Sequence, residues 1–160
     1  MMHVVSIAYT PKNVEQRPEN HYARVVAERV TLVADFGIEG DTKGGSGSRQ
    51  LNIMSSDMLA KLREEGYQVG PGQMGEQIVV SGIALEALEA GARIQIGESA
   101  IVSMSMPRVG CSRFERIQGH PKRETRGRMG IMAHVERGGE IAVGDEVRVL
   151  RALEQERESQ

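Results

Sequence analysis

The chain has 160 residues, with 20 Lys and Arg against 22 Asp and Glu, a formal net charge of −2. Hydrophobic residues make up 39% and aromatic residues 3% of the sequence, which fits one soluble domain and excludes an overall basic, aromatic-rich surface for nucleic acid. The single cysteine excludes an internal disulfide, and no run approaches the ~18 apolar residues of a membrane span. We therefore expect a cytoplasmic single domain over residues 1–150 and a polar tail over 151–160, with no nucleic-acid or membrane partner.

The first half of the chain alternates short apolar runs with polar or glycine-rich breaks. Residues 4–9 and 22–33 are rich in β-branched side chains, which favours strands. Residues 37–48 contain five glycines and predict an irregular loop. The alternating residues 50–54 predict another strand after it.

One helix is clearly indicated after this strand. Ser56 is the predicted N-cap, and Met58, Leu59 and Leu62 lie on one face at helical spacing. Gly66 is expected just beyond the last turn, where a left-handed residue commonly ends a helix.

The second half has a more regular pattern of short strands joined by glycine turns. We expect a strand at 77–80, a helical turn at 85–88, a hairpin of 93–96 with 100–104, a turn-joined pair of 130–135 with 140–141, and a last strand at 146–150. About seven short strands and one clear helix predict a mainly β fold, a closed or partly open barrel with helical decoration.

Positive charge is concentrated in residues 107–128, which carry seven basic residues against Glu115 and Glu124, a local charge of +5. Six of the seven are arginines, whose planar fork matches phosphate or carboxylate. A site for a compact anion is one interpretation, and a solvated loop is the other. The basic residues are Arg108, Arg113, Arg116, Lys122, Arg123, Arg126 and Arg128.

The only cysteine, Cys111, lies inside this basic segment between Arg108 and Arg113. Nearby positive charge stabilises the thiolate, the form that attacks sulfur or binds a metal. The alternative is a small buried side chain, but Cys111 has no apolar neighbour on either side.

Two further patterns are weaker. The glycine-rich loop could hold a phosphate on its backbone N–H groups with help from Lys43 and Arg49, although it lacks the ending of a P-loop. Glu76 stands in a second glycine-rich stretch and is either a site carboxylate or a turn residue. The four histidines are scattered, which argues against a zinc site.

Seven short motifs occur in one order along the chain, and together they resemble the MOSC domain, the module similar to the C-terminal region of molybdenum cofactor sulfurases. The resemblance covers residues 38–150. The motifs are Gly37-Ile38-Glu39-Gly40-Asp41, Arg49-Gln50-Leu51-Asn52-Ile53, residues 71–78 with Gly82, residues 91–97, Pro107-Arg108-Val109-Gly110-Cys111, Gly127-Arg128-Met129-Gly130, and Gly138-Gly139 with Gly144-Asp145.

The resemblance implies a barrel of the pyruvate-kinase-barrel type and binding of the molybdenum cofactor, a molybdopterin. In this family the cysteine that matches Cys111 is a proposed sulfur carrier or a molybdenum ligand. The implied activity is reduction of N-hydroxylated compounds or sulfur transfer, and the alternative is a non-catalytic cofactor carrier. The expected cofactor-binding residues are Lys43, Arg49, Glu76, Arg108, Arg113, Arg126 and Arg128.

The chain departs from the family pattern at three points. Lys43 stands where a histidine is common, Glu76-Gln77 replaces a Glu-Asn pair, and Gly110 replaces a proline before the cysteine. The desulfurase-like domain of full sulfurases is missing, so pyridoxal phosphate is not expected in this chain. The resemblance then implies a separate partner, either an electron donor or a cysteine desulfurase as sulfur donor.

Overall fold

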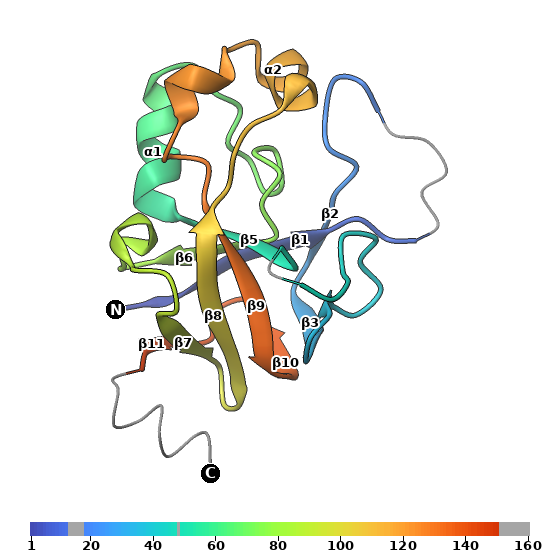
Figure 1. Cartoon of the computed structure of the whole chain (residues 1–160), viewed down its shortest axis with the longest axis vertical. Coiled ribbons are helices and arrows are strands. Elements are labelled where there is room, and N and C mark those ends of the chain that lie inside the picture. The colour runs from blue at the N-terminus through green and yellow to red at the C-terminus, as the bar shows by residue number, and fades with distance from the viewer. Residues whose placement is uncertain (13–17, 48, 151–160) are drawn as a thin grey trace.

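The computed structural model describes residues 1–12, 18–47 and 49–150, so the tail predicted at 151–160 lies outside the described residues. These residues form an eight-stranded sheet and a three-stranded sheet, with two α-helices and two short 3-10 helices (Figure 1). The predicted mainly β fold is confirmed. The elements are β1 (His3–Tyr9), β2 (Val25–Ala27), β3 (Arg29–Val33), β4 (Gly37–Ile38), β5 (Leu51–Ser55), α1 (Ser56–Glu64), β6 (Ile78–Ser81), η1 (Leu85–Ala87), β7 (Arg93–Ile96), β8 (Ala100–Pro107), α2 (Ser112–Gln118), η2 (Lys122–Thr125), β9 (Ile131–Arg137), β10 (Gly139–Ala142) and β11 (Val147–Val149).

The larger sheet is a partly open barrel. Its strands follow the order β11-β7-β8-β9-β5-β6-β1-β2, and β5 with β6 is the parallel pair among antiparallel neighbours. The sheet is not closed by a continuous ladder, yet the segment before β11 reaches β1. The Val4 N–H donates to the Asp145 carbonyl at 2.9 Å, and the Val147 N–H donates to the Met2 carbonyl at 3.0 Å.

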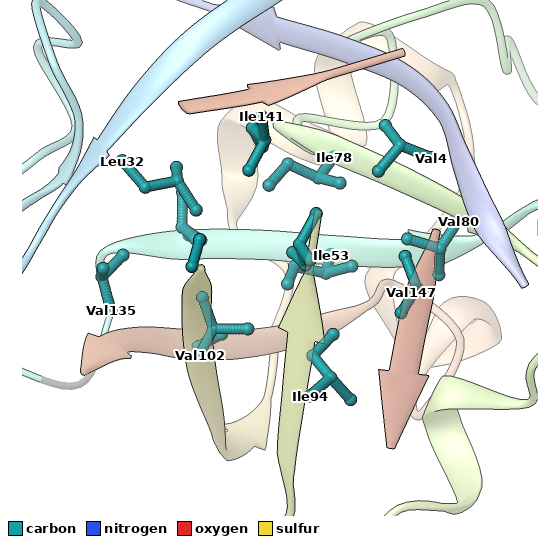
Figure 2. Packing of buried hydrophobic residues seen from close by; sticks show 14 of the residues in the cluster. Val4, Leu32, Ile53, Ile78, Val80, Ile94, Val102, Val135, Ile141 and Val147 are labelled. Atoms are coloured by element: carbon teal, nitrogen blue, oxygen red, sulfur yellow. The ribbon is translucent and has the colours of Figure 1, made fainter. Parts of the chain in front are cut away.

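Alternating side chains of these strands fill the barrel with aliphatic groups (Figure 2). In β7, Ile94 and Ile96 are buried, while Arg93 and Gln95, which alternate with them, are partly exposed. All five residues of β5 are buried, because Ile53 faces the barrel core and Met54 faces a second apolar cluster beneath α1. Strand β5 thus connects the barrel to the helical end of the molecule.

Helix α1 forms where the sequence predicts it, but its cap lies one residue earlier. Ser55, not Ser56, is the N-cap, and its hydroxyl accepts a hydrogen bond from the Met58 N–H at 3.2 Å. Ser56 is the first helical residue because β5 continues through Ser55 and leads directly into the helix. The predicted end is confirmed, since Gly66 follows the C-cap with φ of 95°.

The two predicted hairpins differ in outcome. Strands β7 and β8 pair as expected, with Ile94 opposite Val102. The prediction that β9 pairs with β10 is wrong, because β10 pairs with β3 in the three-stranded sheet. The chain passes so close to β3 at Gly138 that a Cβ there would lie 2.5 Å from the Leu32 carbonyl oxygen. This approach directs β10 away from β9.

The basic segment contains a helix that the sequence pattern did not predict. Strand β8 ends at Pro107, α2 begins at Ser112, and Gly119 ends α2 in the left-handed region with φ of 71°. The apolar face of α2 consists of Phe114 and Ile117. Two apolar residues in so short a helix are too few to produce a recognisable helical periodicity of hydrophobic residues. Helices α1 and α2 lie at the same end of the molecule, toward which β8 points (Figure 1).

Candidate functional site

A cavity of about 240 Å³ opens where β8 runs into α2, next to the loops that precede β5 and β6. Its lining contains five cationic side chains, one thiol and, among the described residues, no carboxylate. The lining residues are Tyr22, Arg24, Lys43, Arg49, Asn52, Gly75, Gln77, Arg108, Cys111, Arg113 and Met132. We call this cavity the thiol cavity.

The Tyr22 ring brings three of the arginines together. The guanidinium carbons of Arg24, Arg108 and Arg113 lie 5.8, 5.7 and 5.0 Å from its centroid. Cation–π attraction to one ring offsets part of the repulsion between these like charges. The Tyr22 hydroxyl also accepts a hydrogen bond from Arg108 Nη2 at 3.1 Å. Tyr22 therefore brings Arg24, its near neighbour in sequence, together with two arginines of the basic segment.

Carbonyl groups of the loop before β6 hold two of these arginines. Arg108 Nη1 donates to the Met74 carbonyl, and Arg24 Nη2 donates to the Gly75 carbonyl at 2.7 Å. Arg24 Nη1 donates to the Thr10 hydroxyl at 3.0 Å. Gly75 has φ of 84°, and a Cβ there would lie 2.7 Å from Arg108 Nη2. A glycine at this position thus permits the approach of the Arg108 side chain.

Glu76 lies behind this loop and is not part of the cavity lining. Its carboxylate is 1% exposed and accepts hydrogen bonds from the Gly72 N–H at 2.8 Å and the Met74 N–H at 3.1 Å. Burial raises the pKa of Glu76, although these backbone N–H groups and the charge of Arg24 oppose the rise. Glu76 shapes the loop whose carbonyls position the arginines, so the structure gives it a positioning role.

Cys111 is exposed and is the N-cap residue of α2. Burial of the thiol acts to raise its pKa, but the backbone N–H groups of Phe114 and Arg113 and the charges of Arg108 and Arg113 outweigh it, and the pKa is lowered. A lowered pKa increases the fraction of thiolate at neutral pH. The predicted neighbours of Cys111, Arg108 and Arg113, line the same cavity.

Amide side chains form part of the cavity wall. The Gln77 side chain accepts from the Asn52 N–H at 2.8 Å and donates to Asp41 Oδ2 at 3.3 Å. Asn52 Nδ2 donates to the Met129 carbonyl at 3.1 Å. Two buried atoms of lining residues, Asn52 Oδ1 and Arg24 Nε, have no hydrogen-bond partner within the described part of the chain. They offer one acceptor and one donor beside the cations.

Buried Asp41 fixes the glycine-rich loop that carries the remaining two cations. Its Oδ1 accepts from the Lys43 N–H at 3.1 Å and from the Thr10 N–H at 3.2 Å. Lys43 and Arg49, which the sequence predicts as candidate anion-binding residues, are exposed and line the thiol cavity.

The other two predicted arginines lie outside the thiol cavity. Arg126 lines a neighbouring cavity that residues 107–110 also line. Arg128 pairs with Glu65 just after α1, with Arg128 Nη2 2.9 Å from Glu65 Oε1. The structure therefore divides the basic segment into arginines near Cys111 and arginines near α1 and η2.

The family profile of the MOSC domain matches residues 39–148. The chain belongs to the MOSC domain family. No curated protein matches the sequence. Residues 39–148 of this MOSC protein include Lys43, Arg49, Glu76 and every basic residue between 107 and 128.

Solved structures share the fold of this MOSC protein. The YUAD protein of Bacillus subtilis is 22% identical and has a TM-score of 0.73, with 93% of this chain and 96% of that chain covered. YiiM of Geobacillus stearothermophilus is 20% identical with a TM-score of 0.70, over 94% and 76% of the two chains. YiiM of Escherichia coli is 19% identical with a TM-score of 0.67, over 94% and 70%. The confirmed assignment to the family agrees with the resemblance read from the motifs.

The thiol cavity suits the cofactor that the family implies. Its cations match a phosphate, its thiol is a soft metal ligand, and its unpartnered Asn52 Oδ1 and Arg24 Nε match polar edges of an organic group. Within the described residues no cluster of three or more His, Cys, Asp or Glu side chains could hold a bare metal ion. Among the residues that line the thiol cavity, Cys111 is the thiol that could serve as a metal ligand.

Sequence reasoning missed the residues that come from other parts of the chain. Tyr22 and Arg24 lie before the matched region, in a stretch that shows only a strand pattern. Asn52 and Gln77 lie inside recognised motifs but carry no charge that would mark them, and Met132 reads as an ordinary strand residue. No described helix is long or apolar enough to span a membrane.

Proposed function

We propose that this MOSC protein binds the molybdenum cofactor in the thiol cavity, with its phosphate on the cationic side chains and Cys111 acting as metal ligand or sulfur carrier. One observation carries this proposal. The only cysteine is exposed, with a lowered pKa, in a cavity whose lining holds five cations and no described carboxylate.

The arginines would bind the anion at little entropic cost because they are already oriented. Arg108 is held by the Met74 carbonyl and the Tyr22 hydroxyl, and Arg24 by the Gly75 carbonyl and the Thr10 hydroxyl. Guanidinium groups fixed before binding lose less rotamer freedom than mobile ones. Lys43 and Arg49 add exposed charge at the same cavity.

As a metal ligand, Cys111 would make the protein a reductase of N-hydroxylated compounds. The bound cofactor supplies a two-electron redox centre. The overall reaction cleaves an N–O bond and consumes two electrons from a separate electron-donor protein and two protons, which yields the reduced nitrogen compound and water. In this role the chain supplies the thiolate of Cys111 and the fixed positive charge around it.

As a sulfur carrier, Cys111 would take sulfur from a protein persulfide, such as that of a cysteine desulfurase. The Cys111 thiolate attacks the terminal sulfur of the donor persulfide, a new S–S bond forms, and the donor cysteine leaves as a thiolate. The lowered pKa of Cys111 favours this step because it raises the thiolate fraction. A non-catalytic carrier would use the cations alone.

Molybdenum per chain, measured by elemental mass spectrometry on protein purified anaerobically from cofactor-producing cells, tests the proposal. We expect near-stoichiometric metal in the wild type, a large loss in Arg108→Gln, and no change in Arg116→Gln, an exposed arginine outside the cavity. Loss of molybdenum in Cys111→Ser supports the role of Cys111 as a metal ligand. Retention of molybdenum in this variant means that Cys111 is not the ligand, and supports the sulfur carrier or the non-catalytic cofactor carrier. Absence of molybdenum from the wild type contradicts cofactor binding.

The sulfur-carrier role needs its own measurement. Intact-mass spectrometry after incubation with a cysteine desulfurase and cysteine should show a gain of one sulfur atom on the wild type and none on Cys111→Ser. If the wild type gains no sulfur, the sulfur-carrier role of Cys111 is rejected, and metal ligation is the remaining role proposed for this residue.

A further inference from the structure

A second cavity, of about 430 Å³, is lined by residues 107–110 and does not include Cys111 in its lining. Its walls are residues 107–110, the η2 region with Lys122, Arg123 and Arg126, and Met129. Arg108 is the one side chain that lines both cavities. We call this second cavity the η2 cavity.

The floor of the η2 cavity is apolar. Met129 is 1% exposed, and Val109 and Pro107 contribute exposed hydrocarbon at its edge. Gly110 lets η2 pack close to this wall, since a Cβ there would lie 2.8 Å from Lys122 Cβ and 3.3 Å from Met129 Sδ. The volume falls within the ~300–1,000 Å³ range of small-molecule pockets.

The rim of the η2 cavity carries unneutralised positive charge. The side chains of Lys122, Arg123 and Arg126 are exposed and form no hydrogen bond or ion pair with any described residue. Neither acidic residue of the same segment pairs with the side chain of one of these three cations in the described structure. Glu115 accepts from the Lys122 backbone N–H at 2.9 Å, and Glu124 faces His120 Nδ1 at 3.4 Å.

We propose that the η2 cavity is a binding site for a small organic anion with an apolar body, such as an aryl or alkyl carboxylate, sulfonate or phosphate. The apolar body lies against Met129 and Val109, and the anionic group faces Arg123 and Arg126. A bare inorganic anion would leave the apolar floor exposed, and a neutral hydrocarbon would leave the cations without a partner. The η2 cavity shares Arg108 with the thiol cavity, but the contacts proposed here come from Met129, Val109, Arg123 and Arg126 and do not involve Cys111.

A pair of fluorescent probes with the same aromatic body tests the site on the cofactor-free chain. 1-Anilinonaphthalene-8-sulfonate carries a sulfonate, and N-phenyl-1-naphthylamine is uncharged. We expect saturable one-to-one binding of the sulfonate probe and at least tenfold weaker binding of the uncharged probe. Amide chemical shifts in ¹H–¹⁵N spectra should change at Val109, Gly110 and Gly127.

Charge variants distinguish binding in the η2 cavity from non-specific binding of the probe to the protein surface. Arg123→Gln and Arg126→Gln should each lower the affinity for the sulfonate probe by roughly three- to tenfold, because each removes one charge-assisted contact. Arg116→Gln, an exposed arginine outside the cavity, should bind as the wild type does. Equal affinity for both probes, unchanged affinity in Arg126→Gln, shifts mapped elsewhere, or no saturable binding would each overturn the proposal.

Discussion

The thiol cavity and the η2 cavity share Arg108 and are both basic, yet their other cations are held in different ways. In the thiol cavity, Arg24 and Arg108 donate to backbone carbonyls and lie beside the Tyr22 ring. In the η2 cavity, Arg123 and Arg126 extend from a short 3-10 region with no partner in the described structure. Within the described residues, contacts with the rest of the protein hold the first set of arginines in place, and no such contacts hold Arg123 and Arg126.

The cause of this difference lies in what stands behind each set of arginines. The loop before β6 presents its carbonyls to the thiol cavity because Glu76 binds the N–H groups of Gly72 and Met74 from the opposite side. Nothing comparable in the described residues supports Arg123 and Arg126. A buried carboxylate thus organises a cationic site without contacting its ligand, and a high local charge alone does not reveal which arginines are fixed.

The largest effect is expected from Glu76→Ala. Removal of the buried carboxylate leaves two loop N–H groups without partners and removes one negative charge that acts on Arg24, the other being that of Asp41. We expect the free energy of unfolding in urea to fall by about 3–5 kcal/mol, with a loss of order at Arg24 and Arg108. Glu98→Ala, an exposed glutamate, is the matched control and should unfold as the wild type does.

The pH dependence of stability tests the same carboxylate. Burial raises the pKa of Glu76 in the folded state, so unfolding releases a proton between the ordinary glutamate pKa and the folded-state pKa. Stability from this group therefore falls as pH rises through that window. The stability of the wild type relative to Glu76→Gln, measured by urea unfolding, should therefore fall as pH rises through that window. A relative stability that rises with pH there would contradict the raised pKa.

A pair of glycine variants tests the two cavities directly. Gly75 and Gly127 have φ of 84° and 79°, but only Gly75 is crowded, with Arg108 Nη2 2.7 Å from its Cβ position. Gly127→Ala should cost about 1 kcal/mol for the left-handed backbone alone. Gly75→Ala should cost about 2–3 kcal/mol, because the Arg108 side chain must also move. Equal costs in thermal or urea unfolding would show that Arg108 is not held against the loop.

Local patterns predicted most of the fold. The alternation of Ile94 and Ile96 predicted the β7–β8 hairpin, and Gly66 marked the end of α1. The pairing of β10 with β3 could not be predicted, because the close passage of Gly138 past Leu32 joins residues about a hundred positions apart. Sequence pattern is informative about neighbours along the chain and says little about such distant contacts.

The candidate site follows the same rule. Arg108 and Arg113 share the thiol cavity with Cys111 because they are close in sequence, and the charge pattern was sufficient to associate them. Arg126 and Arg128 belong to the same charge run, but the turn through η2 carries them elsewhere. Tyr22, an uncharged residue far from Cys111 in sequence, could be found only from the folded structure.

Thiol reactivity provides a smaller effect that separates the cavities. Burial opposes a low pKa at Cys111, and the charge of Arg108 helps the nearby backbone N–H groups to overcome it. Arg108→Gln should therefore raise the pKa of Cys111 and slow alkylation by iodoacetamide at pH 7 by roughly two- to fivefold. Arg126→Gln, in the other cavity, should leave the rate unchanged. An equal slowing in both variants would mean that the pKa of Cys111 depends on the total charge of the protein and not on the position of Arg108.

The smallest effect is expected at the ion pair between Arg128 and Glu65. The hydrogen bond from Arg128 lowers the pKa of Glu65, so any stability from this pair is present above the ordinary glutamate pKa and is lost as pH falls through the folded-state value. Both side chains are accessible to solvent, which screens their attraction. Arg128→Gln should therefore leave the urea midpoint at pH 7 and the molybdenum content close to those of the wild type. A marked loss of molybdenum in Arg128→Gln alone would mean that the cofactor phosphate extends beyond the thiol cavity toward α1.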